Sequence, residues 1–165
     1  KKEDQIGLKG KSTNGGWHSK DTLHEHDKFQ EFKSEIFNFA DEAFMHLGVQ
    51  KEYFPEITGM WGIVNPPGSS NKLHNHPYNF MSGVYYLQVP EDSGRIVFHD
   101  PKPQAEVLSP PRVENHSIHV AHRVNFKPQN GTLLLFPSYV NHEVEENNSQ
   151  EDRIIVSFNI NFKRR

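Results

Sequence analysis

Short apolar segments separated by turn-forming residues fill most of the chain after residue 55, and they constrain its fold more than any other feature. They lie at 57–65, 72–76, 80–89, 94–99, 117–126, 132–136, 142–146 and 152–162. Clusters such as Pro66-Pro67-Gly68 and Gln129-Asn130-Gly131 interrupt them. Segments of this length, bounded in this way, predict β-strands rather than helices. About eight strands in succession predict a fold of two packed sheets.

One segment ahead of these strands has the periodicity of a helix. Between residues 27 and 47, apolar side chains recur every three or four positions, as expected for an amphipathic helix. Asp27 is placed to cap its N-terminus, and Gly48 to end it. The expected fold is therefore mainly β, a double-stranded β-helix (cupin-like jelly roll) over 57–162 with one N-terminal amphipathic helix packed on the sheet. Residues 1–16 are polar and glycine-rich and predict a loosely packed arm of a single domain, 1–165.

Composition narrows the classes of partner. The net charge is −3 and no long basic block occurs, which argues against nucleic acid as a ligand. The chain has no cysteine, so any metal must be held by His, Asp or Glu. No apolar run reaches membrane-spanning length and no signal peptide is visible. A soluble, cytoplasmic protein is expected.

Histidine is unusually frequent, at 11 of 165 residues, and two histidines form a pattern that suits a metal. His74 and His76 are two positions apart in a predicted strand, so their side chains share one face, roughly 7 Å apart along the chain. Two imidazoles placed in this way can bind one ion. They can equally be polar residues on a solvated strand face.

Two residues further along the chain favour a ligand site. His142 follows the apolar strand 132–136 and a turn with proline, which places it at the mouth of a barrel. Arg153 begins the last strand and shares a face with Ile155 and Ser157. An inward arginine is costly unless an anion pairs with it, and a bound dicarboxylate would supply that anion, with Ser157 as a second donor. A surface ion pair is the alternative, with Glu145, Glu146 or Asp152.

Together these motifs resemble the Fe(II)/2-oxoglutarate-dependent oxygenases. That superfamily carries H-x-(D/E)…H and a later arginine on a double-stranded β-helix. The closer resemblance is to a small group of prolyl-hydroxylase-like oxygenases within it. The matching segments are 12–19, 74–90, 93–101, 131–144 and 153–159, which together span nearly the whole chain.

The resemblance implies a role for six residues. His74, His76 and His142 would hold Fe(II). Arg153 would pair with the far carboxylate of 2-oxoglutarate, and the hydroxyls of Ser157 and Tyr86 would bind the same cosubstrate. His76 departs from the pattern, because the prolyl-hydroxylase-like members carry a carboxylate there. Three imidazoles still leave three positions open on the metal, but they raise the net charge of the site by one. The other carboxylate considered as a ligand is that of Asp100.

The implied activity is an Fe(II)- and 2-oxoglutarate-dependent oxygenase that uses O₂, converts 2-oxoglutarate to succinate and hydroxylates an unidentified substrate. A peptidyl side chain is the substrate expected by analogy, and a small molecule is the alternative. Two other functions stay open. A three-His cupin-type dioxygenase would not use 2-oxoglutarate and would not need Arg153. A non-catalytic jelly-roll module would bind a metal or an anion without consuming O₂. A homodimer is a further expectation.

The remaining histidines and aromatic residues give weaker signals. His119 and His122 face opposite ways in the predicted strand 117–126, so with His116 they are expected to be polar surface positions. Trp61 is expected in the core or the pocket wall. Tyr78 and Asn79 follow the histidine pair and are expected at the substrate entrance.

Overall fold

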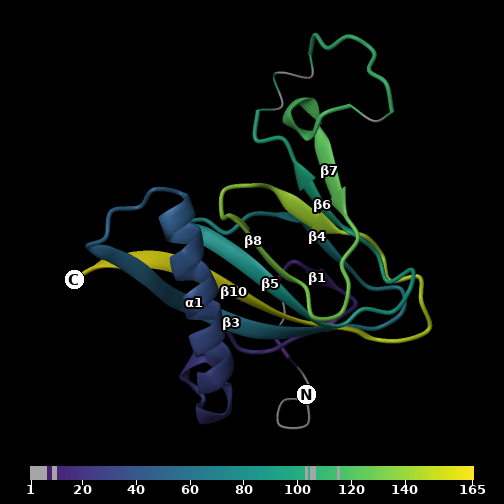
Figure 1. The fold of residues 1–165 in the computed structure, drawn as a ribbon. Coiled ribbons are helices and arrows are strands. Elements are labelled where there is room, and N and C mark those ends of the chain that lie inside the picture. Colours follow the sequence, from purple (N-terminus) through teal and green to yellow (C-terminus); the bar gives the residue numbers. More distant parts are fainter. Residues whose placement is uncertain (1–6, 9–10, 103, 105–106, 115) are drawn as a thin grey trace.

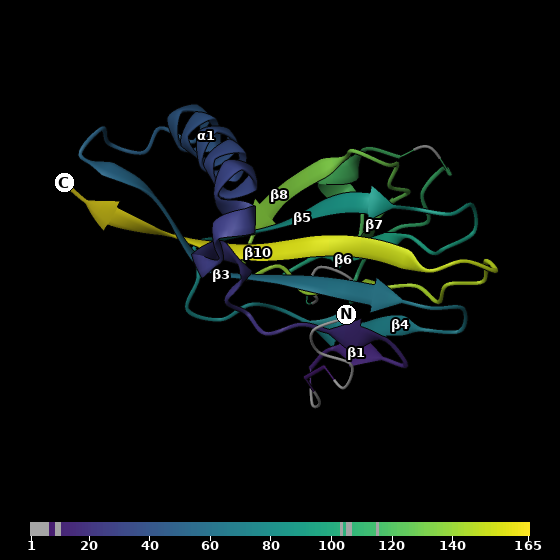
Figure 2. The same ribbon diagram turned by 90° about the horizontal axis from the view of Figure 1, so that it is seen from below.

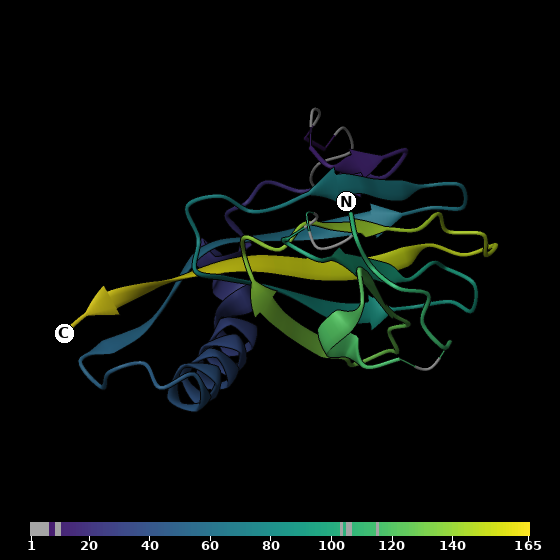
Figure 3. The same ribbon diagram turned by 90° about the horizontal axis from the view of Figure 1, so that it is seen from above.

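Two five-stranded antiparallel sheets pack face to face, and helix α1 covers the outer side of one of them (Figure 1). The computed structural model describes residues 7–8, 11–102, 104, 107–114 and 116–165. Figures 2 and 3 show the three layers from below and from above. The architecture confirms the predicted mainly β, double-stranded β-helix fold with a helix on its sheet.

The first sheet has the order β1-β4-β9-β6-β7. Its strands are β1 (Thr13–Asn14), β4 (Ser70–His74), β9 (His142–Val144), β6 (Ile96–His99) and β7 (Arg123–Phe126). The second sheet has the order β2-β3-β10-β5-β8. Its strands are β2 (Trp17–His18), β3 (Tyr53–Asn65), β10 (Arg153–Arg164), β5 (Met81–Gln88) and β8 (Leu133–Pro137).

Helix α1 (Gln30–His46) packs on the second sheet through one face. Its buried residues Ile36, Ala40 and Phe44 are spaced four apart, so they lie along one side of the helix. They join a core cluster with residues of β3, β5 and β10, namely Ile57, Met60, Met81, Val156, Phe158 and Ile160. A second cluster fills the space between the sheets, with Trp61, Ile63, Val84, Tyr86, Ile96, Phe136 and Ile155.

The N-terminal end of the helix differs from the prediction. Asp27 does not cap α1, because a 3-10 turn (Asp27–Phe29) comes first and α1 begins at Gln30. Phe29 occupies the cap position and its side chain makes no capping hydrogen bond. At the other end Gly48 has a φ of 73°, the left-handed conformation that ends helices and that glycine adopts without strain.

The segment predicted as a strand over 117–126 is only partly one. Ile118–Val120 is a 3-10 turn, and β7 begins at Arg123. Strand β7 pairs with β6 from Ile96 to His99, and Pro101 follows soon after. The Asp100 N–H still donates to the His122 carbonyl at 2.9 Å, but Pro101 cannot donate the next ladder hydrogen bond, so the pairing ends there. The β6–β7 hairpin and the described residues that follow β6 and precede β7 extend away from the body of the molecule (Figure 1).

The N-terminal arm expected over 1–16, together with the two residues that follow it, enters both sheets. Residues 1–6 and 9–10 lie outside the described part of the chain. Thr13 and Asn14 pair with β4, while the adjoining Trp17 and His18 pair with β3. The arm therefore crosses from one sheet to the other. Within the described residues, no helix is both long and apolar enough to cross a membrane.

Candidate metal centre

The rings of His74, His76 and His142 lie together at one end of the space between the sheets. One ligand nitrogen of each lies within 4.8 Å of those of the other two. The ring centroids are 4.3 Å apart for His74 and His142, 5.1 Å for His74 and His76, and 5.2 Å for His76 and His142. In the described part of the chain, this is the group of three side chains whose spacing suits a metal ion.

Strand pairing explains how two of these residues meet. His74 ends β4 and His142 begins β9, and the two are directly opposite one another in the ladder. Side chains of directly opposed residues lie about 5 Å apart on one face of a sheet. A separation of 68 residues in sequence (142 − 74) therefore becomes a direct contact.

His76 reaches the group by another route. The strand predicted over 72–76 ends at His74, so the two histidines do not share a strand face. The His76 backbone N–H donates instead to the carbonyl of Ser138 at 3.0 Å, just past β8. Its ring lies beside Trp61, with centroids 5.7 Å apart. The third imidazole therefore comes from a loop residue, His76, whose backbone is hydrogen-bonded to a residue that follows a strand of the other sheet.

Hydrogen bonds fix which nitrogen of two rings carries the proton. His74 Nδ1 lies 2.7 Å from the Lys72 carbonyl, and His142 Nδ1 lies 3.0 Å from the Val140 carbonyl. A carbonyl only accepts, so in each neutral ring Nδ1 donates and Nε2 keeps its lone pair. Carbonyl-bound imidazoles of this kind are oriented to offer Nε2 to a metal.

Burial keeps all three rings neutral. It lowers the pKa of His76 to about 3, with the nearby rings of His142 and His74 adding to the effect. Burial likewise lowers the pKa of His142 to about 4 and lowers the pKa of His74 against two backbone hydrogen bonds. Neutral imidazoles are the form that binds metal, so the group is ready for an ion at pH 7 without releasing protons.

A cavity of about 480 Å³ opens beside the three histidines. Tyr86 and Ser157, two of the residues predicted to bind the cosubstrate, line it. Its deeper wall is apolar and comes from both sheets, with Trp61, Ile63, Val84, Ile96, Phe136, Val144 and Ile155. The rest of the lining is polar or charged, so the cavity combines an apolar wall with many groups that can hydrogen-bond a ligand.

Arg153 is a neighbour of Tyr86, which lines the cavity, but does not itself line it. Only 1% of its surface is exposed, and it is not among the residues that line the cavity. Nη1 donates to the Ser93 carbonyl, and Nη2 has no hydrogen-bond partner among the described residues. Burial lowers the pKa of Arg153 to about 10, and the neighbouring Tyr86 opposes that effect. The guanidinium is thus a buried cation at neutral pH with one nitrogen unpaired.

The surface ion pair considered for Arg153 is not formed with Glu145. The carboxylate of Glu145 binds Arg95 through both oxygens, at 2.9 Å each. Asp100 also lies outside the histidine group, and its carboxylate accepts from the Lys102 backbone N–H at 2.8 Å. Burial raises the pKa of Tyr86, so its hydroxyl remains protonated and able to donate.

Sequence reasoning gave no role to three residues that line the same cavity: Lys11, His18 and Asp21. His18 is buried and its ring stacks on Trp61, with centroids 5.7 Å apart and an angle of 14° between the planes. His18 lies in the segment 12–19 that carries part of the family resemblance, and that was the available signal. Tyr78 is 96% exposed, and neither it nor Asn79 lines the cavity.

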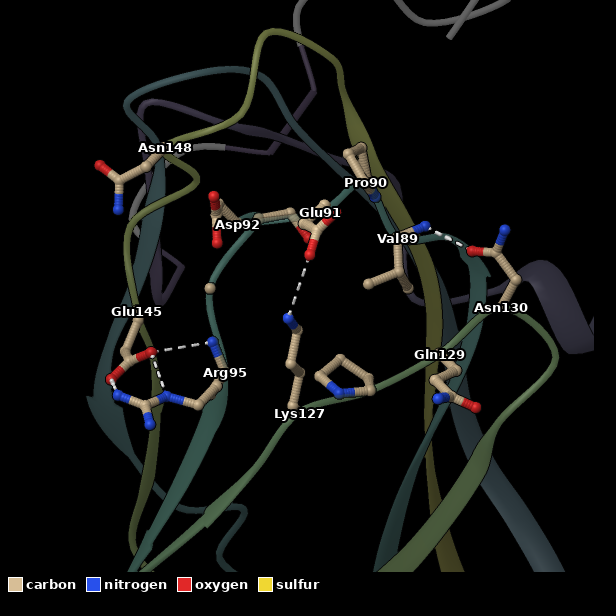
Figure 4. Close-up of a pocket in the computed structure, with 13 residues that line it drawn as sticks. Val89, Pro90, Glu91, Asp92, Arg95, Lys127, Gln129, Asn130, Glu145 and Asn148 are labelled. Carbon is tan, nitrogen blue, oxygen red and sulfur yellow. Dashed lines mark hydrogen bonds and ion pairs between the residues drawn. The ribbon is translucent and has the colours of Figure 1, made fainter.

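A second cavity, of about 750 Å³, lies at the far end of β6 and β9 from the histidines (Figure 4). The loops 89–95 and 127–130 form most of its wall. It holds the Arg95–Glu145 pair and a looser Lys127–Glu91 pair at 3.8 Å. None of the six residues predicted for the site lines it in the described part of the chain.

The fold is a double-stranded β-helix, and its three histidines could hold a metal ion. A family model described as "Putative 2OG-Fe(II) oxygenase" matches residues 59–159. The chain belongs to this family, whose cofactors are Fe(II) and 2-oxoglutarate. The matched range includes all six predicted site residues, whereas Lys11, His18 and Asp21 precede it. No curated protein matches the chain.

Solved structures of oxygenases share the fold. A prolyl-4-hydroxylase from Pseudomonas putida has a TM-score of 0.63 and 15% identity, over 99% of this chain and 79% of its own. A viral collagen prolyl hydroxylase from Paramecium Bursaria Chlorella virus-1, in complex with 2-oxoglutarate, has a TM-score of 0.58 and 16% identity, over 93% and 82%. An oxidoreductase of the 2OG-Fe(II) oxygenase family from Burkholderia pseudomallei has a TM-score of 0.52 and 15% identity, over 85% of this chain. This chain spans 54% of the length of that protein.

Proposed function

We propose that this protein is an Fe(II)- and 2-oxoglutarate-dependent oxygenase whose iron is held by His74, His76 and His142. The observation that carries the proposal is the convergence of three neutral imidazoles at the mouth of a cavity lined by Tyr86 and Ser157. Family membership supports the choice of metal and cosubstrate. On this proposal residues 1–165 form one oxygenase-like domain.

The residues present suit both groups. Imidazole nitrogen is a common ligand of iron, and three protein ligands leave positions open for a chelating 2-oxo acid and O₂. The unpaired Nη2 of buried Arg153 is the second point of fit, since a buried charge without a partner is costly and an anion would relieve that cost. A dianionic cosubstrate also suits a site where His76 has replaced a carboxylate.

Each residue has a definite task in the proposed reaction. Bound Fe(II) and 2-oxoglutarate supply the oxidising chemistry, in which 2-oxoglutarate and O₂ yield succinate, CO₂ and an oxygen atom for the substrate. Arg153 holds the far carboxylate of the cosubstrate, with the hydroxyls of Ser157 and Tyr86 donating beside it. The carbonyls of Lys72 and Val140 hold two of the three rings in place. The apolar wall excludes water from the reacting atoms.

The substrate proposed is a peptidyl side chain that becomes hydroxylated. Support comes from the prolyl hydroxylases that share the fold, and it is an argument from analogy. A small-molecule substrate, the homodimer and the cytoplasmic location stay predictions.

A three-His dioxygenase that does not use 2-oxoglutarate is the second candidate. The observation that favours it is His76, an imidazole where the prolyl-hydroxylase-like pattern has a carboxylate. The buried Arg153 distinguishes the two candidates, because a dioxygenase without a dicarboxylate has no use for its unpaired nitrogen.

Anaerobic addition of Fe(II) and then 2-oxoglutarate to the apo-protein tests the proposal. A visible charge-transfer band of a chelated 2-oxo acid is expected in the wild type and is expected to be lost in Arg153→Ala at the same concentrations. Arg95→Ala, which removes an exposed arginine of the second cavity, should keep the band. A wild type without a band, or an unchanged band in Arg153→Ala, would refute the proposal.

A further inference from the structure

Lys11, in the N-terminal arm, and Asp21, shortly after it, place a charged pair in the wall of the cavity. Lys11 Nζ and Asp21 Oδ2 are 2.8 Å apart, and both residues line the cavity with the three histidines. The other charged lining residue outside the histidine group is Lys72. None of the roles proposed for iron or 2-oxoglutarate uses this pair.

Backbone hydrogen bonds fix the position of both residues. Next to Lys11, the Ser12 carbonyl accepts from the Lys72 N–H of β4 at 2.9 Å. The Asp21 carbonyl accepts from the Met60 N–H of β3 at 2.9 Å. The residue after Lys11 is thus bound to one sheet and Asp21 to the other, so the pair spans the two sheets, with side chains that are 39% and 44% exposed.

The carboxylate of Asp21 has acceptor capacity to spare. Its Oδ1 is buried and has no hydrogen-bond partner within the described residues. His18 Nδ1 is 3.9 Å from this oxygen and already lies 2.6 Å from the Ser19 carbonyl, to which it donates. Burial lowers the pKa of His18, so its ring is neutral and does not balance the carboxylate. A carboxylate accepts up to about four hydrogen bonds, so Asp21 can receive a further donor.

Lys11 offers the complementary capacity. An ammonium has three N–H donors, and the pair with Asp21 uses one of them. A ligand that presents a donor to Asp21 and an oxygen acceptor to Lys11 therefore satisfies both partners at once. A protonated amino group next to a carboxylate or an amide carbonyl meets this requirement. Its amine would face Asp21, and its carboxylate or carbonyl oxygen would face Lys11.

We propose that Lys11 and Asp21 form the substrate-recognition subsite and that it binds a protonated amine adjacent to a carboxylate or amide carbonyl. This inference rests on the proposed function, since it assigns the substrate of the same iron site. The chemistry is shared by a free amino acid and by the amino terminus of a peptide. Two ring contacts, His18 on Trp61 and Trp61 on His76, link the subsite to the proposed iron ligands.

The experiment uses the wild-type holoprotein with Fe(II) and 2-oxoglutarate. Free L-amino acids, short peptides with a free amino terminus, and the same peptides N-acetylated are compared in succinate release. Anaerobic titrations followed by tryptophan fluorescence report binding independently of turnover, since Trp61 lies in the cavity wall. Stimulation and binding are expected with free amines and not with the 2-hydroxy acid analogues or acetylated peptides. Comparing free amino acids with peptides shows which of the two is the substrate that carries the amine.

Variants then test the two residues. Asp21→Asn and Lys11→Met are each expected to raise the half-saturating amine concentration by about tenfold or more, the usual effect of losing a hydrogen bond to a charged group. Lys20→Glu, an exposed change next to Asp21 and outside the cavity, should have no effect. Equal binding of amines and their hydroxy analogues by the wild type would overturn the proposal, as would unchanged half-saturation in both variants. A wild type that forms the 2-oxoglutarate band yet fails these tests refutes the subsite alone.

Discussion

At the scale of single residues, the site depends on charges that burial has made unusual. Arg153 is a buried cation with an unpaired nitrogen, while the three histidines, one buried and two partly buried, are bases that stay neutral. Both conditions are costly in the empty protein. Both become favourable when a dianion and a divalent cation bind, which is why these residues carry the proposed function.

The first prediction concerns Arg153. Arg153→Lys keeps a positive charge but loses the planar fork that binds a carboxylate through two parallel hydrogen bonds. We expect the half-saturating 2-oxoglutarate concentration, read from the charge-transfer band, to rise by about 10- to 100-fold, which corresponds to the loss of one charged hydrogen bond. Arg95→Lys is the matched control, because Arg95 is exposed and paired with Glu145. Equal half-saturation in wild type and Arg153→Lys would exclude this role.

The second prediction concerns pH. In the unfolded chain the histidine pKa is about 6.5, whereas burial lowers the pKa of His76 to about 3 and that of His142 to about 4. Between these values the unfolded state binds more protons than the folded state, so the apo-protein loses stability as the pH falls from about 6.5 towards 4. At pH 7 this contribution to stability is fully present.

Urea titrations of the apo-protein at several pH values measure this slope. His76→Asn should lower it by up to about one proton, since one buried group that titrates only on unfolding has been removed. Phe39→Ala, an exposed change that removes no titratable group, should leave the slope unchanged. The same slope in His76→Asn and wild type would show that His76 is not held neutral by the fold.

At the scale of elements, strand pairing and helix packing explain where the site residues lie. The β4–β9 ladder opposes His74 and His142, and the long β3–β10 pair carries Arg153 at one end. Helix α1 covers the outside of this second sheet through Ile36, Ala40 and Phe44. The helix therefore supports the strands that form one wall of the cavity.

The third prediction tests that support. Phe44 is 2% exposed and packs edge-on against Phe80, with centroids 5.4 Å apart. Phe44→Ala should lower the free energy of unfolding by about 3–5 kcal/mol, because a cavity is left that the helix and sheet fill only in part. Phe39→Ala is the control on the same helix, since Phe39 is 48% exposed and its loss should cost about 0.5 kcal/mol or less. Urea denaturation measures both, and similar costs for the two would show that α1 does not pack as described.

The sequence predicts these elements well where periodicity is strong. The helical spacing around Ile36 and the apolar alternation of the strands come directly from packing against a core, so they are visible in one chain. The position of Gly48 also follows from local backbone chemistry. Local signals fail where a distant partner decides the structure. Ile118–Val120 alternates like a strand yet has no strand to pair with, and His76 reaches the site through a hydrogen bond to Ser138.

The candidate site shows the same division. His142 and Arg153 could be predicted as site residues, because each stands at the end of an apolar strand, where a polar side chain is costly unless it has a partner. Lys11 and Asp21 could not be predicted as site residues. They lie in a polar, glycine-rich segment whose composition does not predict where a side chain points. Only the pairing of Thr13–Asn14 with β4 and of Trp17–His18 with β3 places that segment across the cavity.

At the scale of the whole molecule, the proposed iron would connect the two sheets. His74 and His142 belong to β4 and β9 of the first sheet. His76 is tied through its backbone to Ser138, which follows β8 of the second sheet. A metal bound to all three would therefore link the two layers at the mouth of the cavity, in addition to any role in catalysis.

The fourth prediction follows from this link. A metal that binds only the folded protein stabilises it by about 2.7 kcal/mol at a hundred times its dissociation constant, which for a chain of this size raises Tm by about 5–10 °C. Anaerobic Fe(II) or redox-inert Ni(II) should produce this shift in the wild type, and a chelator should reverse it. His142→Ala should abolish the shift, because two remaining imidazoles, both joined to the β4 segment, no longer bridge to β9. His116→Ala, with its exposed ring outside the group, should keep it. An equal shift in His142→Ala would mean that metal binds elsewhere and that the three histidines do not act as one centre.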